Sequence, residues 1–132
     1  MSRAEAAVIR VLLVEYYRSS ETTGIRALLA RVAAARLILE VTDSLSAALQ
    51  RLTRGGIHVV LLDSKLPDAE GLEGLGTLRS RFPDTPIIML TDLDNKQLAP
   101  KALQMGARDC IAKDYIDSHL LGQIILRHAK GE

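Results

Sequence analysis

Short apolar runs alternate along the chain with longer segments in which apolar residues recur at every third or fourth position. The runs are rich in β-branched residues and are bounded by polar or turn residues, a pattern that predicts strands. Three of them are apolar at nearly every position, as parallel strands covered on both faces must be. The predicted strands are VIRVLLV (8–14), RLILEV (36–41), IHVVLL (57–62), PIIML (86–90) and DCIA (109–112).

The segments that follow these runs have the spacing of amphipathic helices. A strand followed by a helix, five times in 132 residues, predicts one α/β domain with a five-stranded parallel sheet, right-handed crossovers and helices on both faces. The first two predicted helices contain Ile25, Leu28, Leu29 and Val32, then Leu45, Ala48, Leu49 and Leu52, and the others cover 70–81, 99–105 and 116–130.

Pro100 sets the expected start of the fourth helix. A proline inside a helix costs about 3 kcal/mol, whereas at the first helical position it costs almost nothing. We therefore expect this helix to begin at Ala99 or Pro100, with residues 94–98 outside it.

Composition removes several classes of function. The net charge of +1 gives no bulk electrostatic reason to expect nucleic acid or an anionic membrane as a partner. The single cysteine, Cys110, allows neither an intrachain disulfide nor a cysteine-based metal cluster. No run approaches the roughly 18 apolar residues that a membrane span needs. We expect a soluble, cytoplasmic protein that binds neither nucleic acid nor membrane.

Four polar residues leave the carboxyl ends of four predicted strands, which is where open parallel sheets bind ligands. Each residue alone is most simply a helix cap or a solvated loop residue. Together, two carboxylates suit a hard cation such as Mg²⁺, and a hydroxyl and an ammonium beside them make a place for a phosphoryl group. The four residues are Glu15, Asp63, Thr91 and Lys113.

The stretches VLLVE, VVLLDSKLPDAEGLE, TPIIMLTD and MGARDCIAK resemble, in order and spacing, the motifs of response-regulator receiver domains of two-component signalling. The resemblance covers nearly the whole chain. It implies a three-layer, doubly wound, flavodoxin-like (βα)5 fold of the CheY-like type with strand order 2-1-3-4-5. It also implies a phosphoacceptor switch rather than an enzyme.

The same resemblance assigns roles to individual residues. Asp63 is expected to be the phosphoacceptor, Thr91 the switch hydroxyl and Lys113 the partner of the phosphoryl group. Mg²⁺ is expected to be bound by Glu15, Asp63 and the backbone carbonyl of Lys65. The implied partners are a histidine kinase or phosphotransfer protein, and a downstream domain or protein on the face formed by the fourth helix, fifth strand and fifth helix.

The last predicted helix carries a stripe of Leu120, Leu121, Ile124 and Ile125, which is either its core face or a homodimer contact. Its sequence, KDYIDSHLLGQIILRHAK, resembles receivers that precede sensory or histidine-kinase modules. We therefore interpret residues 1–132 as one receiver domain, either complete in itself or the N-terminal module of a longer signalling protein.

Four positions depart from the family pattern: Tyr16 replaces an acidic metal ligand, Asp92 a small residue, Cys110 an aromatic residue and Asp114 a proline. A phenol is neutral at pH 7 and a poor Mg²⁺ ligand, so we expect weak Mg²⁺ binding and slow phosphorylation. Asp92 is expected to narrow the approach to Asp63, and Cys110 to prevent the usual coupling of the switch threonine to an aromatic residue. The bond before Asp114 is expected to be trans, because a cis bond to a non-proline residue costs about 2.5–4 kcal/mol.

Two main hypotheses follow. In the first, the domain is phosphorylated on Asp63 with impaired metal binding. In the second, it is a degenerate receiver that binds partner proteins without phosphorylation. A third, a phosphatase of another doubly wound family with Asp63 as nucleophile, would need a second acid where Lys65 stands.

Overall fold

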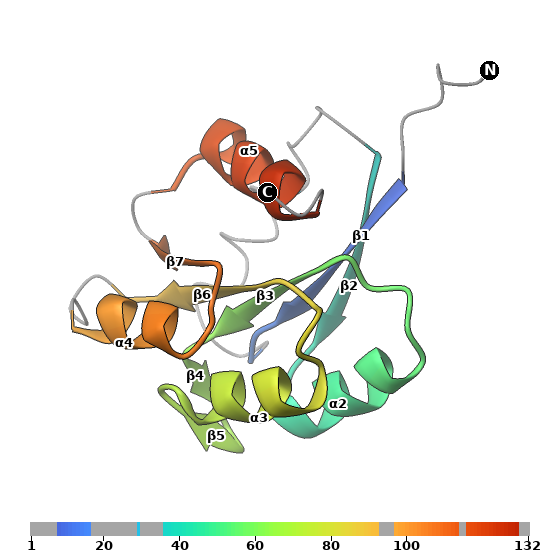
Figure 1. The fold of residues 1–132 in the computed structure, drawn as a ribbon. Coiled ribbons are helices and arrows are strands. Elements are labelled where there is room, and N and C mark those ends of the chain that lie inside the picture. Colours follow the sequence, from blue (N-terminus) through green and yellow to red (C-terminus); the bar gives the residue numbers. More distant parts are fainter. Residues whose placement is uncertain (1–7, 17–28, 30–35, 93–96, 114–115, 130–132) are drawn as a thin grey trace.

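A computed structural model describes residues 8–16, 29, 36–92, 97–113 and 116–129 of the chain. Its centre is a five-stranded parallel sheet with the order β2-β1-β3-β6-β7 (Figure 1). The strands are β1 (Val8–Val14), β2 (Arg36–Thr42), β3 (Val59–Asp63), β6 (Ile87–Thr91) and β7 (Asp109–Ala112). Because β4 and β5 form a separate two-stranded sheet, this order is the predicted 2-1-3-4-5, and the doubly wound fold class is confirmed.

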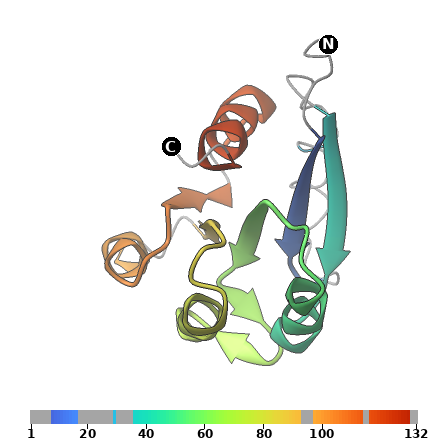
Figure 2. The same ribbon diagram turned by 45° about the vertical axis from the view of Figure 1, so that its right-hand side comes forward.

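The sheet is covered on both faces, which explains why its central strands are apolar at almost every position. All five residues of β3 and of β6 are buried. Since successive side chains of a strand point to opposite faces, alternate residues enter two separate apolar clusters. One cluster joins Leu12, Val60 and Leu62 to helices α2 (Leu45–Thr53), α3 (Glu73–Arg81) and α4 (Leu98–Gln104). The other joins Leu13, Leu61 and Leu90 to α5 (Ser118–Ala129), on the opposite side of the sheet (Figure 2).

The start of α3, and to a smaller extent that of α4, differs from the prediction. Helix α3 begins at Glu73 and not at residue 70, because β4 (Lys65–Leu66) and β5 (Ala69–Glu70) form an antiparallel hairpin before it. Helix α4 begins at Leu98, one residue before the predicted start. Pro100 therefore lies in the first turn, where backbone N–H groups have no acceptor within the helix, so it removes no helical hydrogen bond.

The other boundaries agree to within about two residues. Helix α5 starts at Ser118 and not at 116, and β3 starts at Val59 and not at 57. The helix predicted around Ile25 lies outside the described residues except for Leu29, which is helical and buried. None of the helices in the described part of the chain is long and apolar enough to cross a membrane.

Candidate functional site

The four predicted site residues lie at the same edge of the sheet, because they end or directly follow parallel strands. Asp63 and Thr91 are the last residues of β3 and β6, while Glu15 and Lys113 directly follow β1 and β7. All four are buried, with exposed fractions of 0% for Glu15, 3% for Asp63, 5% for Thr91 and 8% for Lys113. Buried polar side chains are costly unless they are paired, so their shared location marks a site.

Asp63 is held by one contact on each carboxylate oxygen. Its Oδ1 accepts a hydrogen bond of 2.9 Å from the backbone N–H of Lys65, and its Oδ2 lies 3.0 Å from the Nζ atom of Lys113. Burial alone would lower the pKa of Lys113, but the charge and hydrogen bond of Asp63, with the charges of Asp92 and Glu15, raise it above its ordinary value. Lys113 is therefore an ammonium at neutral pH.

The loop that follows Asp63 is fixed to the neighbouring strand. The Ser64 N–H donates to the Leu90 carbonyl at 3.0 Å, and the Gly71 N–H donates to the Ser64 carbonyl at 2.8 Å. Gly71 has a φ of 59°, a left-handed conformation that glycine adopts without the strain of a Cβ atom. The Gly71–Ser64 hydrogen bond therefore joins the two ends of the β4–β5 hairpin beside the site.

The hairpin is also tied to helix α2, through a residue that sequence reasoning did not single out. The Asp68 carboxylate accepts hydrogen bonds from the N–H groups of Leu45 and Ser46, at 2.8 and 3.0 Å. Burial opposes ionisation of Asp68, but the backbone hydrogen bonds outweigh it and lower its pKa. An aspartate after Leu-Pro signals a turn, yet nothing in the local sequence indicates that it would cap a helix so far away along the chain.

Asp92 places a third carboxylate at the site. Its Oδ1 lies 3.8 Å from the Nζ atom of Lys113, and its Oδ2 forms an ion pair with Lys65. Both lysines belong to the predicted site, Lys65 through its backbone carbonyl. Sequence reasoning expected Asp92 to narrow the approach to Asp63, but it missed the side-chain pairing with Lys65.

The other atypical positions have varied surroundings. Tyr16 is half-buried directly after Glu15. The Thr91 hydroxyl donates to the carbonyl oxygen of Asp92 at 3.3 Å. Cys110 is half-buried in β7, and burial, with the charge of Asp109, raises the pKa of its thiol. Asp114 lies outside the described residues, so the expected trans bond stays a prediction.

The donors at the site fit a Mg²⁺ ion that keeps most of its water. Lys113 contacts Asp63 at 3.0 Å, and the charges of Asp63, Asp92 and Glu15 all act to raise its pKa. Among the described residues, no group of three or more histidine, cysteine, aspartate or glutamate side chains forms a ready metal site. Mg²⁺ is commonly bound by one or two carboxylates plus water, and the buried side chains of Glu15 and Asp63 supply that number. The assignment of these two residues and the Lys65 carbonyl as Mg²⁺ ligands stays a prediction.

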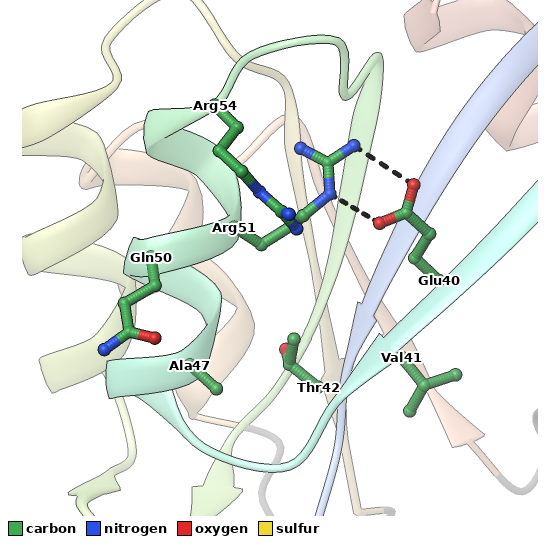
Figure 3. Close-up of a pocket in the computed structure, with 7 residues that line it drawn as sticks. All are labelled: Glu40, Val41, Thr42, Ala47, Gln50, Arg51 and Arg54. Carbon is green, nitrogen blue, oxygen red and sulfur yellow. Dashed lines mark hydrogen bonds and ion pairs between the residues drawn. The ribbon is translucent and has the colours of Figure 1, made fainter.

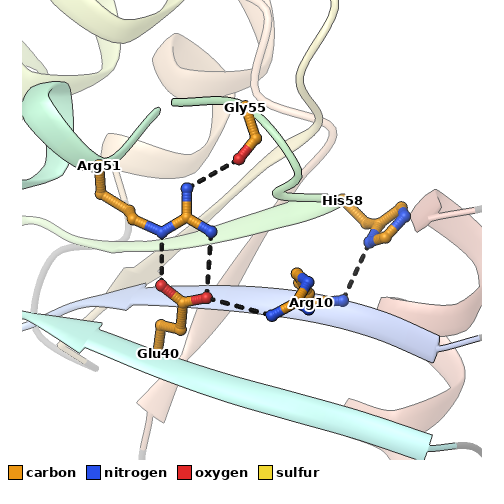
Figure 4. Close-up of polar contacts among 5 residues, drawn as sticks. All are labelled: Arg10, Glu40, Arg51, Gly55 and His58. Atoms are coloured by element: carbon orange, nitrogen blue, oxygen red, sulfur yellow. Dashed lines mark hydrogen bonds and ion pairs between the residues drawn. The ribbon is translucent and has the colours of Figure 1, made fainter. Parts of the chain in front are cut away.

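A cavity of about 410 Å³ lies elsewhere, between β2 and α2 (Figure 3). An ion pair between Arg51 and Glu40 lines one side of this cavity. The Arg51 guanidinium donates to both carboxylate oxygens of Glu40, with one contact of 3.1 Å. It also donates to the Gly55 carbonyl oxygen at 2.7 Å. Arg10 lies 3.6 Å from the same carboxylate, and its backbone N–H donates to Nδ1 of His58 at 2.9 Å (Figure 4). These contacts link α2 to the sheet, so the charges here serve the fold. The cavity is lined by Glu40, Val41, Thr42, Ala47, Gln50, Arg51 and Arg54.

Comparison with known proteins identifies the family to which the fold belongs. The family model of the response regulator receiver domain matches residues 18–125. The chain belongs to this family. Receiver domains act in two-component signalling, generally as phosphoacceptor switches that bind Mg²⁺ at an acidic site. Because the matched region begins after Glu15 and Tyr16, it says nothing about those two positions of this receiver domain.

Two curated relatives match this receiver domain over only part of their own length. It is 32% identical to the response regulator protein FleR of Pseudomonas aeruginosa over 90 residues, which are 68% of this chain and 19% of FleR. It is 33% identical over 117 residues to a protein-glutamate methylesterase/protein-glutamine glutaminase of Bradyrhizobium diazoefficiens, covering 85% of this chain and 28% of the relative. The chain spans between 19% and 34% of the first three curated relatives it matches.

Solved structures share the fold over nearly the whole chain. A receiver domain from Clostridium thermocellum has a TM-score of 0.79 at 22% identity, with 93% of this chain and 95% of that chain covered. The signal receiver domain of a LuxO repressor protein from Vibrio parahaemolyticus has a TM-score of 0.77 at 26% identity, with 95% and 92% covered. The sheet order is therefore that of receiver domains.

Proposed function

We propose that this receiver domain accepts a phosphoryl group on the Asp63 carboxylate. The observation that carries the proposal is the buried pair in which Oδ2 of Asp63 lies 3.0 Å from the Lys113 ammonium. In the transfer, an Asp63 oxygen attacks phosphorus in line, the bond from phosphorus to the donor breaks, and an acyl phosphate remains on the protein. The donor is a phosphohistidine of a histidine kinase or phosphotransfer protein, or a small phosphodonor. Lys113 and the Thr91 hydroxyl then bind the new oxygens.

Glu15, Asp63 and the carbonyl of Lys65 would hold Mg²⁺, which when bound supplies charge neutralisation for the crowded carboxylate and phosphoryl oxygens. Tyr16 weakens this site because it brings no charge. The loss of a unit charge about 4 Å from a cation removes roughly 4 kcal/mol of gross attraction at an effective dielectric of 20. We therefore expect weak Mg²⁺ binding and slow phosphorylation.

The output of the switch would pass through the face formed by α4, β7 and α5. Two of these elements carry exposed large apolar side chains, namely Leu103 on α4 and Leu120 on α5. Of the stripe on α5, Leu121, Ile124 and Ile125 are buried in the core, so only Leu120 of that set is available for contact with a downstream domain, a partner protein or a second copy. Exposed apolar side chains of this kind often mark protein contacts.

A second candidate function is a receiver that binds partners without being phosphorylated. Two observations favour it: Tyr16 stands where the family has an acid, and the Asp92 carboxylate lies 3.8 Å from the lysine that would bind the phosphoryl group. Under either function we propose that residues 1–132 form one receiver unit that acts in the cytoplasm.

Incubation with acetyl phosphate or phosphoramidate and Mg²⁺, followed by intact mass measurement, separates the two functions. A mass gain of one phosphoryl group in the wild type that is absent in Asp63→Asn supports phosphorylation. No gain in the wild type, with the protein folded by circular dichroism, favours the second candidate.

A further inference from the structure

Four charged side chains form a row across the mouth of the site, and the outer two make contacts that phosphoryl transfer does not require. The row runs from buried Asp63 to Lys113, then to Asp92 and then to Lys65. The Asp63 side chain is 2% exposed, Asp92 is 29% exposed and Lys65 is 72% exposed. The row therefore leads from the interior to the surface, and Asp92 lies between the phosphoacceptor and solvent.

The row connects three separate segments of the fold. Lys65 belongs to the β4–β5 hairpin, Asp92 directly follows β6, and Lys113 directly follows β7. A single carboxylate that contacts both ammonium groups therefore joins the hairpin to the far side of the site. Asp92 also pairs with the two ammonium groups that an incoming phosphoryl dianion would otherwise approach first. Charged side chains at these distances dominate the local electrostatic potential.

The balance of charges around Asp63 determines how the contacts of Asp92 affect an approaching anion. Glu15, Asp63 and Asp92 supply three carboxylates against the two ammonium groups of Lys65 and Lys113, so the described part of the site carries an excess negative charge. A phosphodonor is itself an anion. Asp92 consequently opposes its approach both by repulsion and by neutralising Lys113.

We propose that Asp92 is an internal anion that holds the site closed at rest by pairing with Lys65 and Lys113, and that an incoming phosphoryl group must displace it. This inference rests on the proposed function, since it concerns the regulation of the same site. The Thr91 hydroxyl donates to the backbone carbonyl oxygen of Asp92, so a backbone shift that accompanies displacement of the Asp92 carboxylate would move the acceptor of the switch hydroxyl. In this way the occupancy of the lysines is coupled to the position of Thr91.

The first test measures anion binding and does not depend on phosphorylation. Inorganic phosphate is titrated into the wild type and Asp92→Asn, with the amide NMR shifts of Thr91 and Lys113 as the readout. Asp84→Asn is the matched control, because it removes the same charge from an exposed loop at the opposite end of β6. We expect the dissociation constant to fall by up to about fivefold in Asp92→Asn, the upper end of the range for an ion pair near the surface, and to stay unchanged in the control. Equal constants in all three proteins would overturn the proposal.

The second test is a double-mutant cycle on the rate of phosphorylation by acetyl phosphate, with Asp92→Asn, Lys65→Met and the double variant. If Lys65 holds Asp92 in place, the gain from Asp92→Asn is smaller in the Lys65→Met background. If Asp92 acts only by long-range repulsion, the gain is the same in both backgrounds and disappears at high salt, which would overturn the closed arrangement.

The two tests separate failure of this inference from failure of the proposed function. Tighter phosphate binding in Asp92→Asn without any mass gain at Asp63 supports the inference and contradicts the proposed function. Phosphorylation of the wild type at Asp63, with neither phosphate binding nor rate altered in Asp92→Asn, supports the proposed function and contradicts the inference.

Discussion

The Asp63 site at the carboxyl edge of the sheet and the Glu40 network between β2 and α2 both pair carboxylates with cations, and they differ in burial and balance. The Asp63 and Lys113 side chains are 2% and 3% exposed, whereas those of Glu40 and Arg51 are 29% and 13% exposed. Around Asp63, carboxylates outnumber ammonium groups; around Glu40, two arginines share one carboxylate. The first arrangement is unfavourable by itself and would be relieved by an added cation, whereas in the second every carboxylate has cationic partners.

The largest expected effect comes from removing the buried cation. Lys113→Met leaves the Asp63 and Glu15 carboxylates buried without it, so the free energy of unfolding should fall by about 3–5 kcal/mol at pH 7. Urea denaturation measures this change, and Lys101→Met, at an exposed position of α4, is the control. If the free energy of unfolding fell no further than in the control, the buried carboxylates would not depend on Lys113 for their charge compensation.

An acid at position 16 should increase the difference in net charge between the Asp63 site and the Glu40 network. Tyr16→Asp adds a carboxylate beside Glu15, and we expect Mg²⁺ to bind about tenfold more tightly, since water screening reduces the gross attraction of roughly 4 kcal/mol to a fraction. Calorimetric titration of MgCl₂ provides the measurement, and Tyr16→Phe, which changes no charge, should match the wild type. Unchanged affinity in Tyr16→Asp would place the metal elsewhere.

The hairpin beside the site depends on Asp68 for its attachment to α2. Asp68→Ala removes the acceptor for the N–H groups of Leu45 and Ser46, and should cost about 1 kcal/mol of stability, as lost helix caps do. Because the pKa of Asp68 is lowered in the folded protein, this contribution is present above its ordinary value of 3.8 and is lost as the pH falls below it. Thermal unfolding of the two proteins at pH 7 and at pH 3 should show a difference that shrinks in acid.

The smallest effect is expected at the Glu40 network, which lies near the surface. Glu40→Gln should lower the free energy of unfolding by only about 0.2–1 kcal/mol, because Glu40 is near the surface and its pairs are screened by solvent. The Arg51 hydrogen bond lowers the pKa of Glu40, so the contribution is present above the ordinary value of 4.5 and is lost as the pH falls through the lowered pKa. A loss as large as that of Lys113→Met would remove the distinction between the two regions.

The sequence predicted those features that depend on local pattern. The continuous apolar run of β3 predicted a strand covered on both faces. The polar residues at the strand ends predicted that Asp63 and Lys113 lie at one edge of the sheet, and in the structure they are 3.0 Å apart. Pairings between distant segments could not be predicted in this way. The contacts of Lys65 with Asp92 and of Asp68 with α2 depend on how the β4–β5 hairpin folds back, which also displaced the start of α3.

Mapping the modified residue tests the central claim most directly. After incubation with acetyl phosphate and Mg²⁺, an acyl phosphate on an aspartate is reduced by borohydride to homoserine, which peptide mass spectrometry locates. The account predicts homoserine at position 63 in the wild type and none in Asp63→Asn. A protein that stays unmodified at position 63, or that is modified elsewhere, would contradict it.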